Sequence, residues 1–339
     1  MIKEMEFGWL NNHTNIEKKF KYSLDSSIKN AILSVLKDKL TFSVKDIKLL
    51  FPSQSPSGSY RLISNDQEYF MRISSRIGDY CLEKQLVEHL KKDNVSINDI
   101  IIGGIRLDWE GSRFRIDIRE FLNGSYYQNE NSKLISLLKE INAFHKSINN
   151  FSYKEKIKDN QLKITMGKRD LIDTILNCID TNEYDIFNEH SSWVFSHQDW
   201  IGELLNNHNP NLLEMPDAQC IHGQIHPGNV IFAENKVVIF DLETSITTYA
   251  PWAWDYAWVL QRFCLDYGLE NAKLVDKLEI IESYSNLKID DLFRMAKIVV
   301  AENILSVFDY CINKKILVPQ SELNKFYNHE LKLKNVMGI

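Results

Sequence analysis

The residue pattern of this 339-residue chain changes character near residue 122. Apolar runs and alternations predict strands at 60–64, 68–74, 100–105 and 113–121, and apolar spacing predicts helices at 25–38 and 82–90. Beyond Asn123-Gly124, apolar residues such as Leu134, Leu138 and Ile141 recur at helical spacing. A sheet-rich first third and a mostly helical remainder predict a two-lobed α+β fold with a ligand cleft at the junction. We expect residues 1–121 to form the N-terminal lobe and residues 122–339 the C-terminal lobe.

Composition limits the classes of protein that fit this pattern. Hydrophobic residues make up 44% of the chain and charged residues 25%, enough for a sizeable core. The net charge of −6 argues against a general nucleic-acid-binding role, which needs a concentrated basic surface. No segment approaches the roughly 20 apolar residues of a membrane span, and residues 1–6 lack a signal-like apolar region. We therefore expect a cytoplasmic protein. The five scattered cysteines indicate neither a disulfide framework nor a zinc site, and reduced, buried thiols are expected.

The stretch 222–241 carries the most chemical information. It begins His222-Gly223-Gln224-Ile225-His226-Pro227-Gly228-Asn229, whose Gly and Pro residues are typical of a constrained loop. Two apolar runs, 230–232 and 237–240, predict a hairpin that brings Asp241 back beside Asn229. An amide oxygen and a carboxylate are ligands that suit Mg²⁺.

This spacing resembles the catalytic and metal-binding signature of the aminoglycoside phosphotransferase and choline kinase group, His-Gly-Asp-x-x-x-x-Asn followed by a strand that ends in an acid. The resemblance implies a two-lobed protein-kinase-like fold with an antiparallel sheet lobe and a larger helical lobe. It implies that His222, Gln224 and Asn229 form the catalytic loop, and that Asn229 and Asp241 hold Mg²⁺. It also gives Asp255 a structural role in bracing that loop. Gln224 stands where the family has its catalytic Asp.

The N-terminal third resembles the nucleotide-binding part of the same family over several ordered positions. A small-residue loop, 53–59, would cover the phosphates of ATP, with Ser57, Gly58 and Ser59 at its end. Arg72 on a strand would hold phosphate, and Glu83 on the next helix would orient Arg72. The segment 117–124, which includes Glu120 and Leu122, resembles the hinge whose backbone reads adenine. Taken alone, each of these matches would more often be an ordinary turn or a surface ion pair.

Because of Gln224, the sequence does not decide whether the chain is catalytically active. Its amide can orient a hydroxyl but cannot accept a proton near neutral pH, and a missing base costs about 10²–10⁴-fold in rate. Three interpretations remain: an engineered inactive variant, a natural nucleotide-binding pseudokinase, or an active kinase whose acceptor needs no carboxylate base. A helical scaffold that binds no nucleotide would require the N-terminal matches to be accidental.

The acceptor is the least constrained part of the prediction. The resemblance implies a hydroxyl of a small molecule, such as an antibiotic, an amino alcohol or a sugar. Acidic side chains would suit a cationic acceptor; the candidates are Glu243, Asp255, Asp266 and Glu270. The tryptophans at 252, 254 and 258 could stack on a substrate but fit core packing better. The polar stretch 151–170 is interpreted as a solvated helix or connection. Neither the choice between ATP and GTP nor the oligomeric state follows from the sequence.

Overall fold

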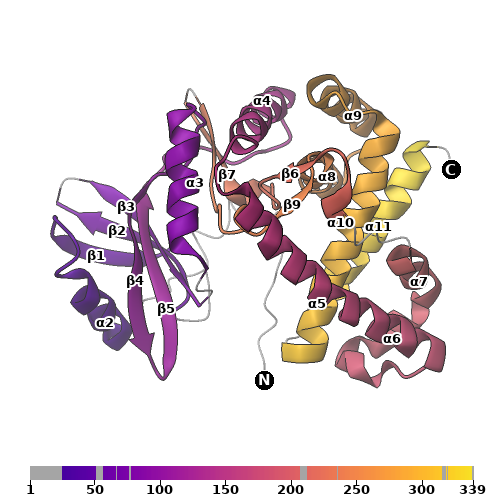
Figure 1. Ribbon diagram of the computed structural model, residues 1–339, viewed down its shortest axis with the longest axis horizontal. Helices are drawn as coiled ribbons and strands as arrows, with labels where there is room; N and C mark the ends of the chain where they lie inside the picture. The colour runs from indigo at the N-terminus through magenta and orange to yellow at the C-terminus, as the bar shows by residue number, and fades with distance from the viewer. Residues whose placement is uncertain are drawn as a thin grey trace.

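The computed structural model describes residues 25–50, 56–65, 67–75, 78–206, 212–234, 236–314, 318 and 320–337. Its first part is an antiparallel sheet in the order β1-β2-β3-β5-β4. The strands are β1 (Val44–Leu49), β2 (Gly58–Ser64), β3 (Glu68–Ser74), β4 (Ile100–Trp109) and β5 (Ser112–Glu120). The sheet lies at one side of the molecule and the larger helical part at the other (Figure 1), so the expected two-lobed α+β fold is confirmed. A division at residues 121 and 122 stays a prediction.

One face of the sheet is covered by α2 (Ser26–Leu36). The side chains Ile28, Ile32 and Leu36 recur every four residues and pack with buried residues of the strands, including Tyr60 and Ile116. The side chain of Asp25 caps the helix by accepting a hydrogen bond from the Ser27 N–H at 2.7 Å. The sequence pattern did not predict β1, an edge strand on which only Ile47 is fully buried.

Helix α3 (Tyr80–Lys92) joins the two lobes. It begins at Asp79, whose carboxylate accepts a hydrogen bond from the Leu82 N–H at 3.0 Å. Its apolar face, which includes Leu82 and Leu86, packs with Phe144 and Leu242 of the helical lobe. The buried carboxylate of Glu83, by contrast, reaches arginines of β5. The helix therefore packs apolar side chains against the helical lobe and directs a charged side chain toward the sheet.

The helical lobe is built around a long, largely buried helix, α10 (Ile289–Asp309), and a short one, α8 (Ala253–Val259), in which every residue is buried. The other α-helices are α4 (Asn131–Ile148), α5 (Lys154–Thr181), α6 (Ser191–Ser196), α7 (Gln198–Asn206), α9 (Asn271–Ser285) and α11 (Gln320–Met337). Helix α5 crosses the front of this lobe in Figure 1. Among the helices that the structure describes, none is long and apolar enough to cross a membrane.

Two small antiparallel sheets frame the segment that carries the motif. The predicted hairpin is present as β7 (Val230–Ala233) and β8 (Lys236–Ile239). Ahead of it, β6 (Ala218–Cys220) pairs with β9 (Tyr249–Pro251), a pairing that the sequence pattern did not predict. The chain between β6 and β7 is thus anchored at both ends, which fixes the loop 221–229.

Candidate active site

A single carboxylate holds the backbone of the loop 221–229. Asp255, in the first turn of α8 and fully buried, accepts hydrogen bonds from the His222 N–H at 2.9 Å and the Gly223 N–H at 2.8 Å. The ring of His145, on α4, donates a third at 2.8 Å. A buried charge is stable only with such partners. The bracing role expected for Asp255 therefore agrees with its contacts.

His222 stiffens the loop as a neutral ring. Its Nε2–H donates to the Phe240 carbonyl at 3.0 Å, and its Nδ1 accepts from the Gln224 N–H at 3.3 Å. Complete burial lowers the pKa of His222 below its ordinary value, which favours the neutral form. These contacts give His222 a positioning role, because both ring nitrogens are occupied within the protein.

Gln224 takes part in the loop through its main chain. Its N–H donates to His222, and its carbonyl accepts from the Asn229 Nδ2 at 3.1 Å. The preceding Gly223 has φ +88, and a Cβ built there would lie 2.5 Å from the Thr248 Oγ1. Only glycine fits such a position without strain. The turn thus presents the half-buried side chain of residue 224 to the surroundings while the backbone stays fixed.

The hairpin places Asn229 and Asp241 next to each other. The Phe240 N–H donates to the Asn229 carbonyl at 3.0 Å, and Asp241 follows in the left-handed conformation with φ +67. Because the Asn229 amide nitrogen is bonded to Gln224, its Oδ1 is the atom left for a cation. Asp241 offers a second oxygen, so the pair fits the hard-ligand chemistry of Mg²⁺.

Arg72 lies beside Asp241, and its ion-pair partners differ from the expected one. The structure pairs Arg72 with Asp241, and with Glu243 at 3.3 Å, whereas Glu83 pairs with Arg115 at 2.8 Å and with Arg119. The expectation that Glu83 orients Arg72 was therefore wrong. Residues 115 and 119 lie on one face of β5, and their guanidinium groups reach Glu83 instead.

The charges around Arg72 are closely balanced. Carboxylate atoms of Glu83, Asp117 and Glu243 lie within 4.8 Å of one another, but Arg115 bonds all three at 2.7 or 2.8 Å. The Arg115 guanidinium offsets one of these three negative charges, while Arg119 pairs with Glu83 and Arg72 pairs with Glu243. Burial alone would raise the pKa of Asp241, but Arg72 outweighs it and holds the pKa below its ordinary value. Asp241 is thus an anion at neutral pH.

The remaining predicted nucleotide residues lie on the sheet and its exit. Ser57 precedes β2, which begins at Gly58, and Ser59 stands opposite Arg72 in the β2–β3 register. Residues 53–55 of the predicted phosphate loop lie outside the described residues. Glu120 ends β5, and the half-buried Leu122 follows it. The Ser125 N–H then donates to the Phe232 carbonyl at 2.9 Å, so residues 121–124 connect the two lobes, as a hinge would.

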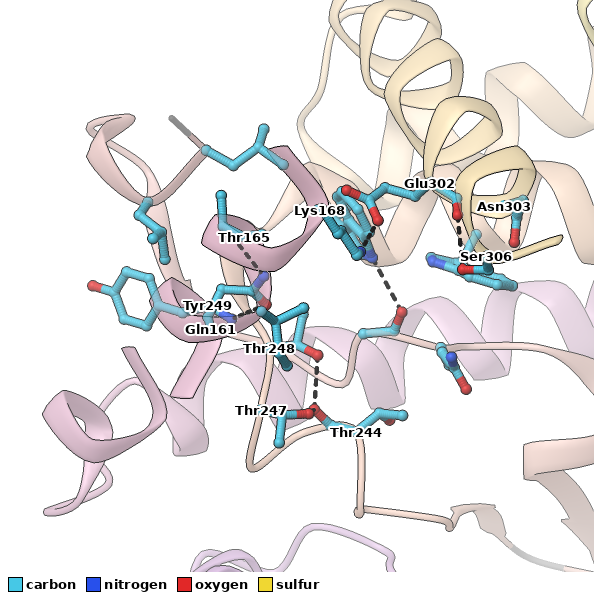
Figure 2. Close-up of a pocket in the computed structure, with 18 of the residues that line it drawn as sticks. Gln161, Thr165, Lys168, Thr244, Thr247, Thr248, Tyr249, Glu302, Asn303 and Ser306 are labelled. Atoms are coloured by element: carbon cyan, nitrogen blue, oxygen red, sulfur yellow. Dashed lines mark hydrogen bonds and ion pairs between the residues drawn. The ribbon is translucent and has the colours of Figure 1, made fainter. Parts of the chain in front are cut away.

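A cavity of about 250 Å³ opens beside Gln224. Figure 2 shows its walls: Thr165 and Lys168 come from α5, Glu302 from α10, and Thr244, Thr247 and Thr248 from the loop after β8. Trp254 and Trp258 also line it, and the Trp254 Nε1–H donates to the Gly223 carbonyl at 3.1 Å. Gln224 therefore both lines this cavity and is hydrogen-bonded to Asn229.

The four acids expected to surround the acceptor do not line this cavity. Asp255 accepts hydrogen bonds from the backbone of the loop 221–229, and Glu243 pairs with Arg72 and Arg115. The remaining two lie elsewhere: Asp266 is bonded to His329 and near Arg262, while Glu270 is exposed ahead of α9. The cationic acceptor that these acids suggested loses its support, because three of them already have partners in the protein.

The cavity residues of α5 were not predicted from the sequence. The polar stretch 151–170 was interpreted as a solvated helix or connection, yet Gln161, Thr165, Lys168 and Arg169 line the cavity. Polar residues at three- and four-residue spacing were the available signal, since such residues share a helix face. A polar stripe is also what a solvated helix shows, so the pattern alone does not separate the two.

The chain is similar in sequence and fold to known phosphotransferases. Residues 180–278 match the model of the phosphotransferase enzyme family. The AMP complex of the spectinomycin phosphotransferase APH(9)-Ia has a similar fold (TM-score 0.62, 14% identity), covering 91% of this chain and 98% of that one. No curated protein matches significantly.

Two further solved structures share the fold. A thermostable mutant of the aminoglycoside phosphotransferase APH(4)-Ia, in a ternary complex with ADP and hygromycin B, has a TM-score of 0.55 at 11% identity, covering 92% of this chain and 98% of that one. A microcompartment-associated aminopropanol kinase has a TM-score of 0.53 at 11% identity, covering 91% and 96%. The expected resemblance to the aminoglycoside phosphotransferase and choline kinase-like family is confirmed.

Proposed function

We propose that this chain is an ATP- and Mg²⁺-dependent phosphotransferase that transfers the γ-phosphate to a hydroxyl of a small molecule. The observation that carries the proposal is that Asn229, Asp241 and Arg72 lie together, while Gln224, which is hydrogen-bonded to Asn229, lines a cavity. Phosphate ligands next to an acceptor-sized space are what in-line transfer requires. Relatives of similar fold, solved with AMP or ADP, support a nucleotide as the donor.

Each residue has a defined part in the transfer. The acceptor hydroxyl oxygen forms a bond to the γ-phosphorus, the bond from that phosphorus to the bridging oxygen breaks, and ADP leaves. Gln224 orients the hydroxyl by hydrogen bonding, and the hydroxyl proton passes to water or to the transferred phosphate, since an amide does not accept it. Arg72 binds phosphate oxygens. Asn229 and Asp241 would hold Mg²⁺, which neutralises charge on the β- and γ-phosphates when bound.

Calorimetric titration with ATP and Mg²⁺ tests the nucleotide half of the proposal. We expect Asp241→Ala to abolish the Mg²⁺-dependent part of ATP binding. Asp291→Ala is the matched control, because Asp291 lies on α10 and, among the residues that the structure describes, forms its ion pair with the exposed Arg294, at 3.0 Å. Equal ATP affinity in the Asp241 variant and the control would remove Asp241 from the metal role.

A catalytically impaired nucleotide-binding protein is the second candidate, and Gln224 is the observation that favours it. A turnover assay on a panel of small hydroxylated compounds compares the chain as given with Gln224→Asp. Phosphorylation by the unaltered chain would exclude the pseudokinase and the inactive engineered variant. Activity only in Gln224→Asp, a gain of about 10²–10⁴-fold, would support one of those two alternatives.

A further inference from the structure

The charged residues of the cavity have an excess of positive charge. Lys168 and Arg169 are its two cations, and Glu302 is the sole carboxylate among the residues known to line it. Lys168 and Glu302 form an ion pair across the cavity, between α5 and α10 (Figure 2), and so neutralise each other. Within the described part of the chain, Arg169 has no ion-pair partner. One positive charge, on the exposed side chain of Arg169, is therefore left among the residues that line the cavity.

Trp258 adds a hydrogen-bond donor that the protein does not use. The residue lines the cavity and is only 7% exposed, and its Nε1–H has no hydrogen-bond partner among the residues described. A buried indole N–H normally finds an acceptor, because leaving it without one costs about 1–3 kcal/mol. Its presence beside a cavity indicates a ligand that supplies an oxygen.

The threonines of the cavity offer hydrogen-bond acceptors to a ligand, whereas Arg169 and Trp258 offer donors. Thr244 donates its hydroxyl proton to the His222 carbonyl at 2.9 Å, while Thr247 and Thr248 donate theirs to the Thr244 carbonyl at 3.0 and 2.7 Å. Their oxygens keep lone pairs that accept hydrogen bonds. The threonines therefore suit a ligand's hydroxyl groups, whereas the cation of Arg169 and the N–H of Trp258 suit an anion.

From these three features we infer that the acceptor is a small hydroxylated anion, such as a sugar acid, with its anionic group toward Arg169 and Trp258 and a hydroxyl toward Gln224. The inference rests on the proposed function, because it names the substrate class of the same site. The cavity of about 250 Å³ is smaller than the roughly 300–1,000 Å³ typical of drug-sized ligands, which favours a molecule of about one sugar ring.

Binding of three probes of the same ring size tests this inference without catalysis. Glucuronate, glucose and glucosamine carry a negative, a neutral and a positive group, and each is titrated calorimetrically into the full chain. We expect glucuronate to bind most tightly and glucosamine most weakly. Glucose or glucosamine binding as tightly as glucuronate, or no binding by any of the three, would overturn the inference.

Variants locate the binding to the cavity. Arg169→Gln should weaken glucuronate binding about tenfold and leave glucose unchanged, and Trp258→Phe, which removes only the N–H, should weaken it about three- to tenfold. Lys163→Gln is the control, because Lys163 is an exposed cation of α5 that does not line the cavity. Equal effects of Arg169→Gln and Lys163→Gln would contradict the site. ATP titration of the same variants distinguishes failure of the proposed function from failure of this inference. Absent ATP binding would count against the phosphotransferase. The preference for an anionic ligand is measured without nucleotide, so it is tested separately.

Discussion

Arg72 on β3 forms an ion pair with Asp241, which lies two positions after the end of β8, so the sheet lobe and the helical lobe meet through opposite charges at the proposed nucleotide site. Both side chains are about one quarter exposed, at 26% and 23%. A phosphate group and the Asp241 carboxylate would compete for the same guanidinium, which makes this pair sensitive to a bound nucleotide.

Arg72→Ala should lower the free energy of unfolding by about 1–3 kcal/mol, because it leaves Asp241 charged and partly buried without its main partner. Urea unfolding monitored by fluorescence measures the change. The control is Lys84→Ala, whose pair with Glu88 spans 3.8 Å on an exposed helix face and should contribute under about 1 kcal/mol. Equal losses in the two variants would show that the Arg72 pair contributes no more than a surface pair.

Asp255→Asn should be destabilising by about 2–4 kcal/mol. The substitution removes the charge that accepts from the His222 and Gly223 N–H groups and from His145, and it points amide hydrogens at one of these donors. Thermal unfolding gives the stability change. Asp291→Asn, on the exposed surface of α10, serves as the reference and should shift the midpoint little. A similar shift in both would argue against the bracing role.

Gly223→Ala and Gly167→Ala should have opposite effects. At Gly223 the added methyl group would meet Thr248 at 2.5 Å with φ at +88, so we expect a loss of about 1–3 kcal/mol. At Gly167, inside α5, a Cβ meets nothing within 4 Å, and the better helix propensity of Ala should stabilise the chain by about 0.5–1 kcal/mol. Chemical unfolding of both variants tests the pair, and a shared sign would contradict the prediction.

Stability should fall as the pH drops from 7 to 5. Burial lowers the folded-state pKa of His222 below its ordinary 6.5, so between these two values the unfolded chain binds more protons than the folded one. The stabilising contribution is complete above pH 6.5 and is lost as the pH falls below it. Urea unfolding at pH 7, 6 and 5 should therefore show a steeper decline in the unaltered chain than in His222→Gln. Identical slopes would mean that His222 does not contribute to the pH dependence.

Much of the fold was predictable because its signals are local. The alternation of Tyr60 and Leu62 along β2, the helical spacing of Ile28, Ile32 and Leu36, and the apolar runs around residues 233–236 each depend on near neighbours in the chain. Strand β1 was missed because a single buried residue on an edge gives no clear alternation.

The partners of the site residues were harder to predict because they depend on side-chain reach across elements. Residue spacing indicates that Glu83 follows Arg72, but only the packing of α3 over β5 decides that Glu83 reaches Arg115 and Arg119. The same holds for Lys168, which meets Glu302 across 134 residues of sequence. Ion pairs of this kind depend on which residues lie close together in the folded protein. The pattern of neighbouring residues in the sequence does not predict that.

The hydrogen bonds found for Gln224 in the loop 221–229 use its main chain, through His222 and Asn229. Asp255 and Gly223 fix the loop's shape from beneath, so the shape is independent of the side chain at position 224. The chain can therefore exchange an amide for a carboxylate there without rearranging its backbone. If the proposed function holds, a single substitution at residue 224 would change the rate of transfer without changing the scaffold around it.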